Sequence, residues 1–241
     1  MRNHVITVCL KQPYTSANIR LEINLGLKHH LCGLTITTVV LVTLTTAPAI
    51  AQEDEPIGSY VVDLRGSLSF YGQSPVIASS RGIVTSTLPS RGQGLAIGAH
   101  WYPLKWRQIT LGLGGEYMST FGSTVSARIS DGLSDKVRIK FVSLAPQLSF
   151  NFGHRNGWSF LSGGISSTRF TVLGEKIPAA DIEPRPKTIN YGGGARWFTN
   201  DHIAFTSDLR FYAMSPVKGN LKTPPTPRMT VVVLNIGVSF R

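Results

Sequence analysis

The sequence has 241 residues, a net charge of +11 and only two cysteines. Both cysteines, Cys9 and Cys32, lie within the first fifty residues, so the rest of the chain has no thiol and cannot be stabilised by disulfides. The excess of 24 Lys and Arg over 13 Asp and Glu predicts an anionic partner. The candidate partners are nucleic acid, a lipid head group and lipopolysaccharide.

Residues 1–51 have the pattern of a secretory signal peptide. Basic residues precede an apolar stretch at 31–46, and the range 49–51 reads Ala-Ile-Ala, a typical cleavage triplet. The alternative is an uncleaved membrane anchor, which needs about 20 apolar residues. The stretch at 31–46 is shorter than that and rich in Thr. We therefore predict export and cleavage after Ala51.

Cleavage at this point changes the charge but not its sign. Residues 1–51 contain four Lys and Arg and one Glu, so the mature chain keeps 20 of the 24 basic residues and 12 of the 13 acidic ones. Its net charge is therefore +8. Because an exported protein does not meet nucleic acid in the cell interior, we expect membrane lipid and lipopolysaccharide as partners, and no nucleic acid.

The mature chain alternates between apolar and polar residues, as a β-strand does when its two faces meet different surroundings. In 60–70, for example, Val62 and Leu64 share one face, and Asp63 and Arg65 share the other. The same alternation recurs seven more times. The eight predicted strands cover residues 60–70, 94–101, 109–117, 137–152, 158–170, 189–197, 203–211 and 234–241.

The connections between these strands alternate in length. Three are hairpin-sized and lie near 103–107, 153–157 and 199–202. The other four have about 15 to 20 residues and lie near 71–92, 118–135, 171–187 and 213–228. Short turns at one end and long loops at the other are typical of outer-membrane barrels.

The sequence therefore predicts an all-β fold, an eight-stranded antiparallel up-and-down transmembrane β-barrel preceded by a signal peptide. The predicted domains are the signal peptide at 1–51, a short periplasmic leader at 52–57 and an outer-membrane barrel at 58–241. The alternative is a soluble barrel of the lipocalin or avidin type, which places apolar residues inside and polar residues outside.

The aromatic residues support the membrane interpretation, because amphipathic aromatic side chains gather at both boundaries of a bilayer. All four Trp residues lie next to the short turns, whereas aromatic residues such as Phe121 and Phe170 lie near the long loops. The membrane-interface aromatics that we predict at the short-turn end are Trp101, Trp106, Trp158, Trp197 and Phe240.

Two predicted strands depart from simple alternation. In 137–152 the apolar residues change from odd to even positions, which predicts a bulge near Phe141. Pro146 in the same strand lacks a backbone donor and predicts a second irregularity. In 158–170, small polar residues and Gly164 interrupt the face that carries Trp158 and Phe170.

Three stretches carry a family resemblance: SLAPQLSFNFG with NGWSFLSGGI at 143–165, NYGGGARWFTNDHIAFTSDLRFY at 190–212, and the closing LNIGVSFR. They resemble the small outer-membrane β-barrel proteins of the OmpA/OmpX type, over about residues 58–241. The resemblance implies an architecture, a compartment and contact with the barrel-insertion machinery during biogenesis. In such proteins the last residue is typically aromatic, whereas here Phe240 is followed by Arg241.

The polar faces of the predicted strands carry charges that would face the lumen. An eight-stranded barrel is just wide enough for side chains to fill it, and charges removed from water need partners. We therefore expect ion pairs that plug the lumen, with glycines making room for the long side chains. The expected lumen cluster consists of Asp63, Arg65, Glu116, Arg196, Asp208 and Arg210.

The expected function is a structural or surface-interaction role, with a small-solute pore as the alternative. A surface-facing enzyme that hydrolyses lipid A or peptide is a second alternative. The three His residues of the mature chain, His100, His154 and His202, lie near the short turns, away from the side where such a catalytic site would face its substrate. Without Cys ligands or a His spacing that suits a metal, the sequence predicts no metal and no cofactor.

Overall fold

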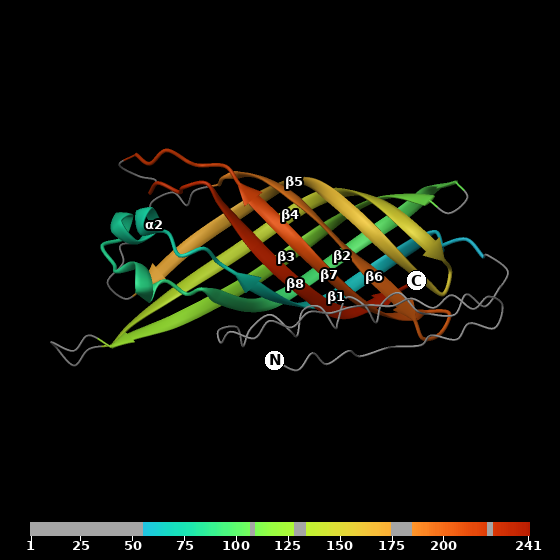
Figure 1. Ribbon diagram of the computed structural model, residues 1–241, viewed down its shortest axis with the longest axis horizontal. Helices are drawn as coiled ribbons and strands as arrows, with labels where there is room; N and C mark the ends of the chain where they lie inside the picture. The colour runs from blue at the N-terminus through green and yellow to red at the C-terminus, as the bar shows by residue number, and fades with distance from the viewer. Residues whose placement is uncertain (1–54, 107–108, 128–133, 175–184, 221–223) are drawn as a thin grey trace, which may run out of the picture. The chain divides into compact units, whose positions relative to one another are not determined.

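The protein forms a closed antiparallel barrel of eight strands, in which the first strand also pairs with the last. The computed structural model describes residues 55–106, 109–127, 134–174, 185–220 and 224–241. The predicted signal peptide at 1–51 lies outside these residues. The strands are β1 (Tyr60–Phe70), β2 (Arg91–Trp106), β3 (Ile109–Ala127), β4 (Ser134–His154), β5 (Gly157–Gly174), β6 (Lys187–Phe198), β7 (Ile203–Met214) and β8 (Met229–Phe240) (Figure 1).

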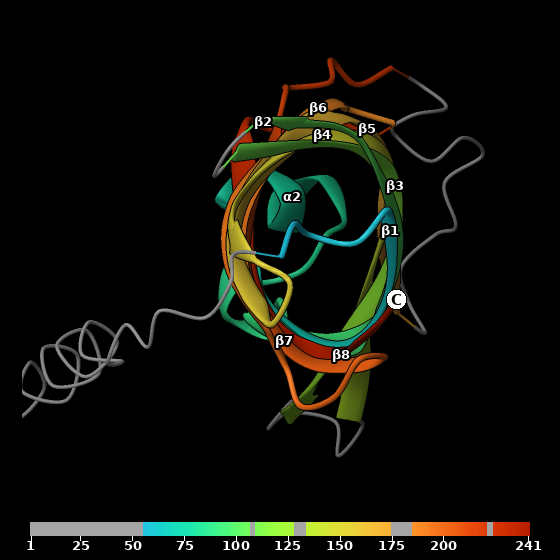
Figure 2. The ribbon, with the colours of Figure 1, turned by 90° about the vertical axis from the view of Figure 1, so that its right-hand side faces the viewer.

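Each strand pairs with its neighbours in the chain, so the topology is a simple up-and-down meander. The view along the barrel shows the ring of strands (Figure 2). At one end, which we call the turn end, two to four residues connect consecutive strands. At the other, the loop end, the connection after β1 contains the short helix α2 (Pro75–Ser80) and the 3-10 turn η1 (Thr85–Thr87).

The prediction of a long loop at 118–135 is wrong. β3 and β4 continue as a paired hairpin well beyond the predicted ends, through Phe121↔Lys140 to Ala127↔Ser134. Only 128–133 lies between the two strands. The sequence pattern suggested a loop because the extension is rich in Ser, Thr, Gly and charged residues, although its backbone pairs like the rest of the sheet.

The predicted bulge near Phe141 is also wrong. β4 keeps one register against β3 from Ser134 to Phe152. Its odd-numbered residues point inward along the whole strand, so Val137, Ile139 and Phe141 are buried inside the barrel. The apolar residues move from even to odd positions toward the loop end because the barrel interior becomes apolar there. The strand itself does not shift.

The irregularity predicted at Pro146 is confirmed on one side of β4. The pairing with β5 is interrupted between Leu144↔Ser167 and Leu148↔Gly163, whereas Pro146 still pairs with Gly115 of β3. Gly164 lies opposite the gap, where an added Cβ would stand 1.9 Å from the carbonyl oxygen of Pro146. The two backbones approach too closely there for any residue with a side chain.

A second irregularity lies in β2, where the register against β3 shifts between Trp101 and Leu104. Pro103 lies inside this step, and a proline cannot donate a hydrogen bond to the ladder. The strand nevertheless resumes pairing and continues to Trp106, so it occupies most of the turn that the sequence predicted at 103–107.

The outer face of the barrel is apolar on every strand. Large side chains such as Leu95, Ile165 and Leu209 are exposed at alternating positions, while the residues between them face the lumen. A contiguous apolar belt of this size would aggregate in water, and it matches the lipid-facing surface of a transmembrane barrel. Among the described residues, no helix is long and apolar enough to cross a membrane.

Candidate functional site

The lumen is the candidate site, because its middle contains all six charged residues that the sequence placed there. Each is at most 3% exposed, so side chains from opposite walls meet away from solvent. The residues come from four strands: Asp63 and Arg65 of β1, Glu116 of β3, Arg196 of β6, and Asp208 and Arg210 of β7.

Arg65 is the centre of this charged layer. Its guanidinium donates to Glu116 through one terminal nitrogen and to Asp208 through the other, so it joins β1 to β3 and β7 across the lumen. Arg210 supports the same carboxylates, with its Nε 3.2 Å from Glu116 Oε2 and 3.3 Å from Asp208 Oδ1. Two arginines therefore neutralise two carboxylates.

Asp63 and Arg196 form a separate pair nearer the turn end. Arg196 donates through Nε (3.1 Å) and Nη2 (2.7 Å) to the two oxygens of Asp63, a bidentate geometry. Ser239 of β8 donates a 2.5 Å hydrogen bond to the same carboxylate. The Arg196 guanidinium also lies over the ring of Phe160, 4.2 Å from its centroid.

Neutral side chains add hydrogen bonds to these charges. Tyr212 donates to Glu116 (2.8 Å), and Asn235 donates to Asp208 (2.7 Å). Arg210 donates to Gln147 (3.1 Å) and Ser162 (2.8 Å) on β4 and β5. A buried charge is stable only with such partners, so the network links the strands and fills the lumen.

Glycines make room for this layer, as the sequence suggested. An added Cβ at Gly194 would stand 2.5 Å from the Cβ of Asp208, and one at Gly98 would stand 3.2 Å from the guanidinium of Arg65. Both glycines face the lumen beside a charged side chain. A larger residue at either position would displace a member of the network.

A cluster of aromatic and aliphatic side chains closes the turn end, and we call it the turn-end cap. It consists of Ile57, Val61, Tyr102, Trp158 and Phe160, with Phe198 packed against it. Ile57 lies in the predicted leader, so part of that segment belongs to the barrel interior. Arg241 covers the same end, with its guanidinium 3.8 Å from the centroid of the Phe198 ring.

The prediction that Trp158 is a membrane-interface aromatic is wrong. Trp158 is 3% exposed and points into the lumen, where it stacks on Phe198 at a centroid distance of 4.9 Å and meets Tyr102 edge to face. Even-numbered residues of β5 face inward, and this parity places Trp158 inside. Exposed fractions of 43% or more place the other four predicted aromatics, Trp101, Trp106, Trp197 and Phe240, on the outer face.

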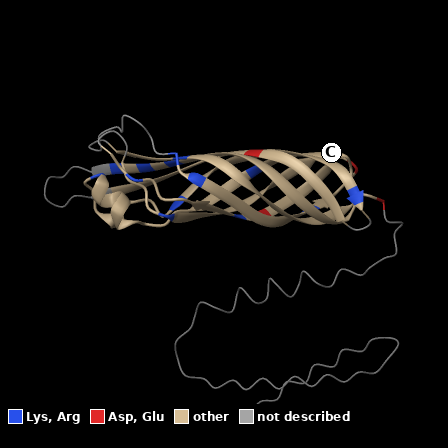
Figure 3. Ribbon diagram, turned by 90° about the horizontal axis from the view of Figure 1, so that it is seen from above, with Lys and Arg blue, Asp and Glu red and all other residues tan. Residues whose placement is uncertain are grey.

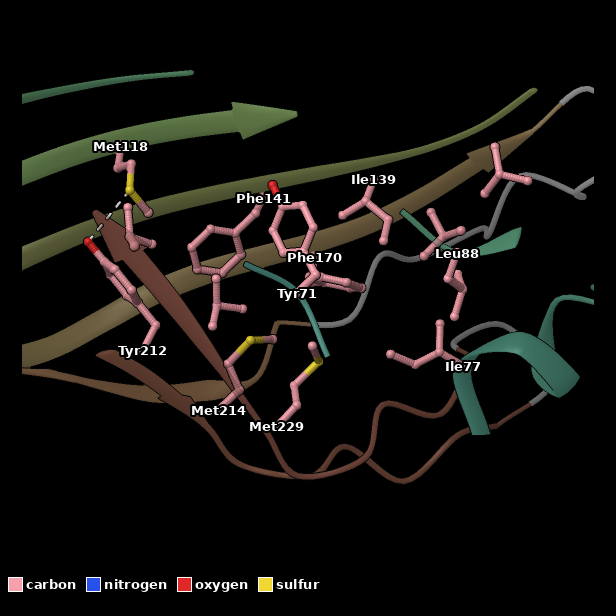
Figure 4. Close-up of a cluster of buried hydrophobic side chains, with 14 of the residues drawn as sticks. Tyr71, Ile77, Leu88, Met118, Ile139, Phe141, Phe170, Tyr212, Met214 and Met229 are labelled. Carbon is pink, nitrogen blue, oxygen red and sulfur yellow. Dashed lines mark hydrogen bonds between the residues drawn. The ribbon is translucent and has the colours of Figure 1, made fainter. Parts of the chain in front are cut away.

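A larger apolar cluster fills the loop end of the lumen, and we call it the loop-end plug (Figure 4). The strands contribute Phe141, Phe170, Tyr212 and Met214, among others. The connection after β1 contributes a second set of side chains, namely Tyr71, Ile77, Ala78 and Leu88.

Two contacts hold this connection in place. Tyr71 meets Phe170 edge to face at a centroid distance of 6.0 Å and shares a 2.8 Å hydrogen bond with Thr120 of β3. Burial raises the pKa of the Tyr71 phenol. The first loop thus folds into the mouth of the barrel, and α2 lies within the ring of strands in Figure 2.

The sequence did not predict this plug. The signal was present in β4, where Val137, Ile139 and Phe141 occupy the inward positions that polar residues occupy further along the strand. Ile77 and Leu88 gave no periodic signal, because they lie in an irregular connection.

The charged layer also contains the side chains that a hydrolase would need, in an unsuitable order. Asp63 lies between His100 and Ser239: the His100 Nδ1 is 3.9 Å from one carboxylate oxygen, and Ser239 donates to the other. In a catalytic triad the histidine lies between the serine and the acid. All three side chains are buried, and no group of three His, Cys, Asp or Glu among the described residues could hold a metal ion.

No protein-family model and no curated protein matches the sequence. The chain is similar to the solved structure of Ail, the attachment invasion locus protein of Yersinia pestis, in complex with the heparin analogue sucrose octasulfate. That match has 9% identity and a TM-score of 0.48, and it covers 76% of this chain and 98% of Ail.

Two further solved structures are similar. Neisserial surface protein A matches at 12% identity with a TM-score of 0.48, over 76% of this chain and 97% of that protein. The outer membrane protein OprG from Pseudomonas aeruginosa matches at 10% identity with a TM-score of 0.44, over 78% of this chain and 97% of OprG. Likenesses this weak carry no argument about binding or activity, and the barrel assignment depends on this chain's own strand pairing.

Proposed function

We propose that the protein is an integral outer-membrane barrel with a closed lumen, which serves a structural or surface-interaction role. The apolar belt supports a place in a bilayer, and among transmembrane folds a closed β-barrel of eight strands is typical of the bacterial outer membrane. The short turns then face the periplasm, and the loop end faces the exterior. Outer-membrane lipid is the immediate partner, with the insertion machinery during biogenesis.

The observation that carries this proposal is the filling of the lumen in three layers. The turn-end cap, the charged layer and the loop-end plug follow one another along the barrel axis, and each consists of side chains from several strands. A solute would have to displace buried aromatic rings at both ends and arginine–carboxylate pairs between them. Function then depends on the outer surface and the loops.

The first test combines gel mobility with conductance. Detergent-extracted protein from fractionated membranes should migrate differently before and after heating, because a closed barrel resists detergent until it is boiled. The same protein in planar bilayers should give no stepwise conductance. A periplasmic protein without a mobility shift would contradict the membrane assignment, and regular single-channel steps would favour the small-solute pore.

A further inference from the structure

Four basic side chains gather on the outer face of the barrel above the apolar belt. Lys136, Arg138 and Lys140 occupy successive outward positions of β4, and Arg169 faces outward from β5. Figure 3 shows that blue bands of Lys and Arg gather near the loop end of the barrel. We call these four residues the basic stripe.

The register places the four charges close together. Successive outward residues of a strand are about 6.8 Å apart, so the three cations of β4 extend over about 14 Å. Lys140 pairs with Thr171, and Arg169 pairs with Val142, which makes Arg169 the diagonal neighbour of Lys140. Diagonal neighbours have Cβ atoms about 7–8 Å apart, within reach of two long side chains that bind one anion.

Within the described part of the chain, no ion pair involves a residue of the stripe. All four side chains are exposed. This contrasts with the arginines of the lumen, which are all paired with carboxylates. Like charges that share a face without acids repel one another, and an external anion would remove that repulsion.

The stripe also lies at the height of lipid head groups. The outward positions of β4 from Phe152 to Val142 carry no polar side chain and cover ten residue steps. Ten steps of about 3.4 Å along a strand tilted by about 40° rise about 26 Å, the height of the apolar band of such barrels. Lys140 is the next outward residue, so the cations begin where the hydrocarbon ends.

A groove beside the stripe combines charge with apolar surface. It has a volume of about 450 Å³ and is lined by Lys136, Arg138 and Lys140 together with Phe121 and Leu173. This combination suits a molecule with an anionic head and an acyl chain. At the same end of the barrel, Lys187 of β6 pairs with Ser167, which makes it a diagonal neighbour of Arg169. The concentration of charge therefore extends from β4 over β5 to β6, whereas Arg91 lies on β2.

We propose that the basic stripe and its groove bind the phosphorylated head group of an outer-leaflet lipid, with the phosphates of lipid A between Lys140, Arg169 and Arg138. This inference rests on the proposed function, because it requires the loop end to face the outer leaflet. The protein would then hold an ordered lipid on one face only.

The test measures the binding of diphosphoryl lipid A, and of lipid A with both phosphates removed, to the full mature chain in phosphatidylcholine nanodiscs. The variant K136Q/R138Q/K140Q removes three charges of the stripe. The control R91Q/K218Q/R228Q removes three exposed charges elsewhere at the loop end, so the net charge of the two variants is equal.

We expect the stripe variant to bind diphosphoryl lipid A at least tenfold more weakly, and the control variant to lose less than twofold. The dephosphorylated lipid should bind every form equally weakly, and K136R/K140R should keep the affinity of the unchanged protein. Equal losses in both triple variants, or none in the stripe variant, would overturn the proposal.

A heat-modifiable mobility shift distinguishes failure of the site from failure of the fold. Both variants should keep the shift, because every substituted side chain is exposed. If a triple variant fails to fold, the single substitution K140Q should still weaken binding by threefold or more. Loss of the shift in the unchanged protein would contradict the proposed function itself.

Discussion

The charged layer and the loop-end plug fill the same lumen by opposite means. In the charged layer, inward positions carry Arg, Asp and Glu, whose pairing is directional and tolerates few replacements. In the plug, inward positions carry Phe, Met, Ile and Val, and a loop supplies the remaining apolar volume. Charged side chains on the strands fill the centre of the barrel without a loop. At the mouth, side chains of the connection after β1 fill part of the apolar interior.

The two regions also differ in how far the effect of a substitution should extend through the barrel. The charged side chains in the middle contact side chains of other strands, so the loss of one should weaken the pairing of several strands. The side chains of α2 contact the plug from a connection that is not part of the sheet, so their loss should act locally. The following predictions test this difference.

The largest effect is expected from Arg65→Met. The substitution keeps much of the volume of the side chain but leaves Glu116 and Asp208 with Arg210 as their remaining cation. Loss of one partner from a buried network costs about 3–5 kcal/mol. Urea unfolding in detergent, followed by gel mobility, should show this loss. Unchanged stability would mean that the charged layer does not hold the strands together.

A smaller effect is expected from Ile77→Ala in α2. Truncation of a buried Ile costs about 2–5 kcal/mol, and a site that can collapse lies at the lower end. The loss should appear as faster proteolysis near Arg81, with an unchanged midpoint for global unfolding. The exposed neighbour Val76 offers a matched control, and Val76→Ala should leave the cleavage rate unaltered.

Gly164→Ala should destabilise the barrel by about 1–3 kcal/mol, as overpacking usually does. The new Cβ would collide with the carbonyl oxygen of Pro146, which is backbone and cannot rotate away. The control is Gly66→Ala, where the nearest atom to an added Cβ is 3.6 Å away. Equal unfolding midpoints for the two variants would contradict the close approach of β4 and β5.

The smallest expected effect is a difference in the quenching of tryptophan fluorescence. In a variant that keeps only Trp158, brominated lipids should leave the emission nearly unquenched, because this indole lies in the turn-end cap. In a variant that keeps only Trp106, which is 76% exposed, the same lipids should quench strongly. Strong quenching of Trp158 would return it to the lipid-facing ring that the sequence predicted.

The sequence determined the strand count, the meander and the inward placement of the six charged residues. These follow from period-two alternation, which has a clear phase wherever the lumen is polar and the outside apolar. β1 shows this most directly, because its predicted range of 60–70 coincides with the strand. The same rule fails in β4 and β5, where Phe141, Trp158 and Phe170 face an apolar interior.

Only the tertiary structure decided which apolar residues fill the lumen and which acid pairs with which arginine. At the start of β5 the apolar Trp158 and Phe160 face inward and Ser159 faces outward, so local alternation indicates the opposite of the true orientation. Ion pairing across the lumen depends on the stagger of strands that are distant in sequence, and Arg65 meets Asp208 across a separation of 143 residues. A local sequence pattern predicts neither the stagger of the strands nor the entry of the loop into the mouth, because both arise only when the barrel closes.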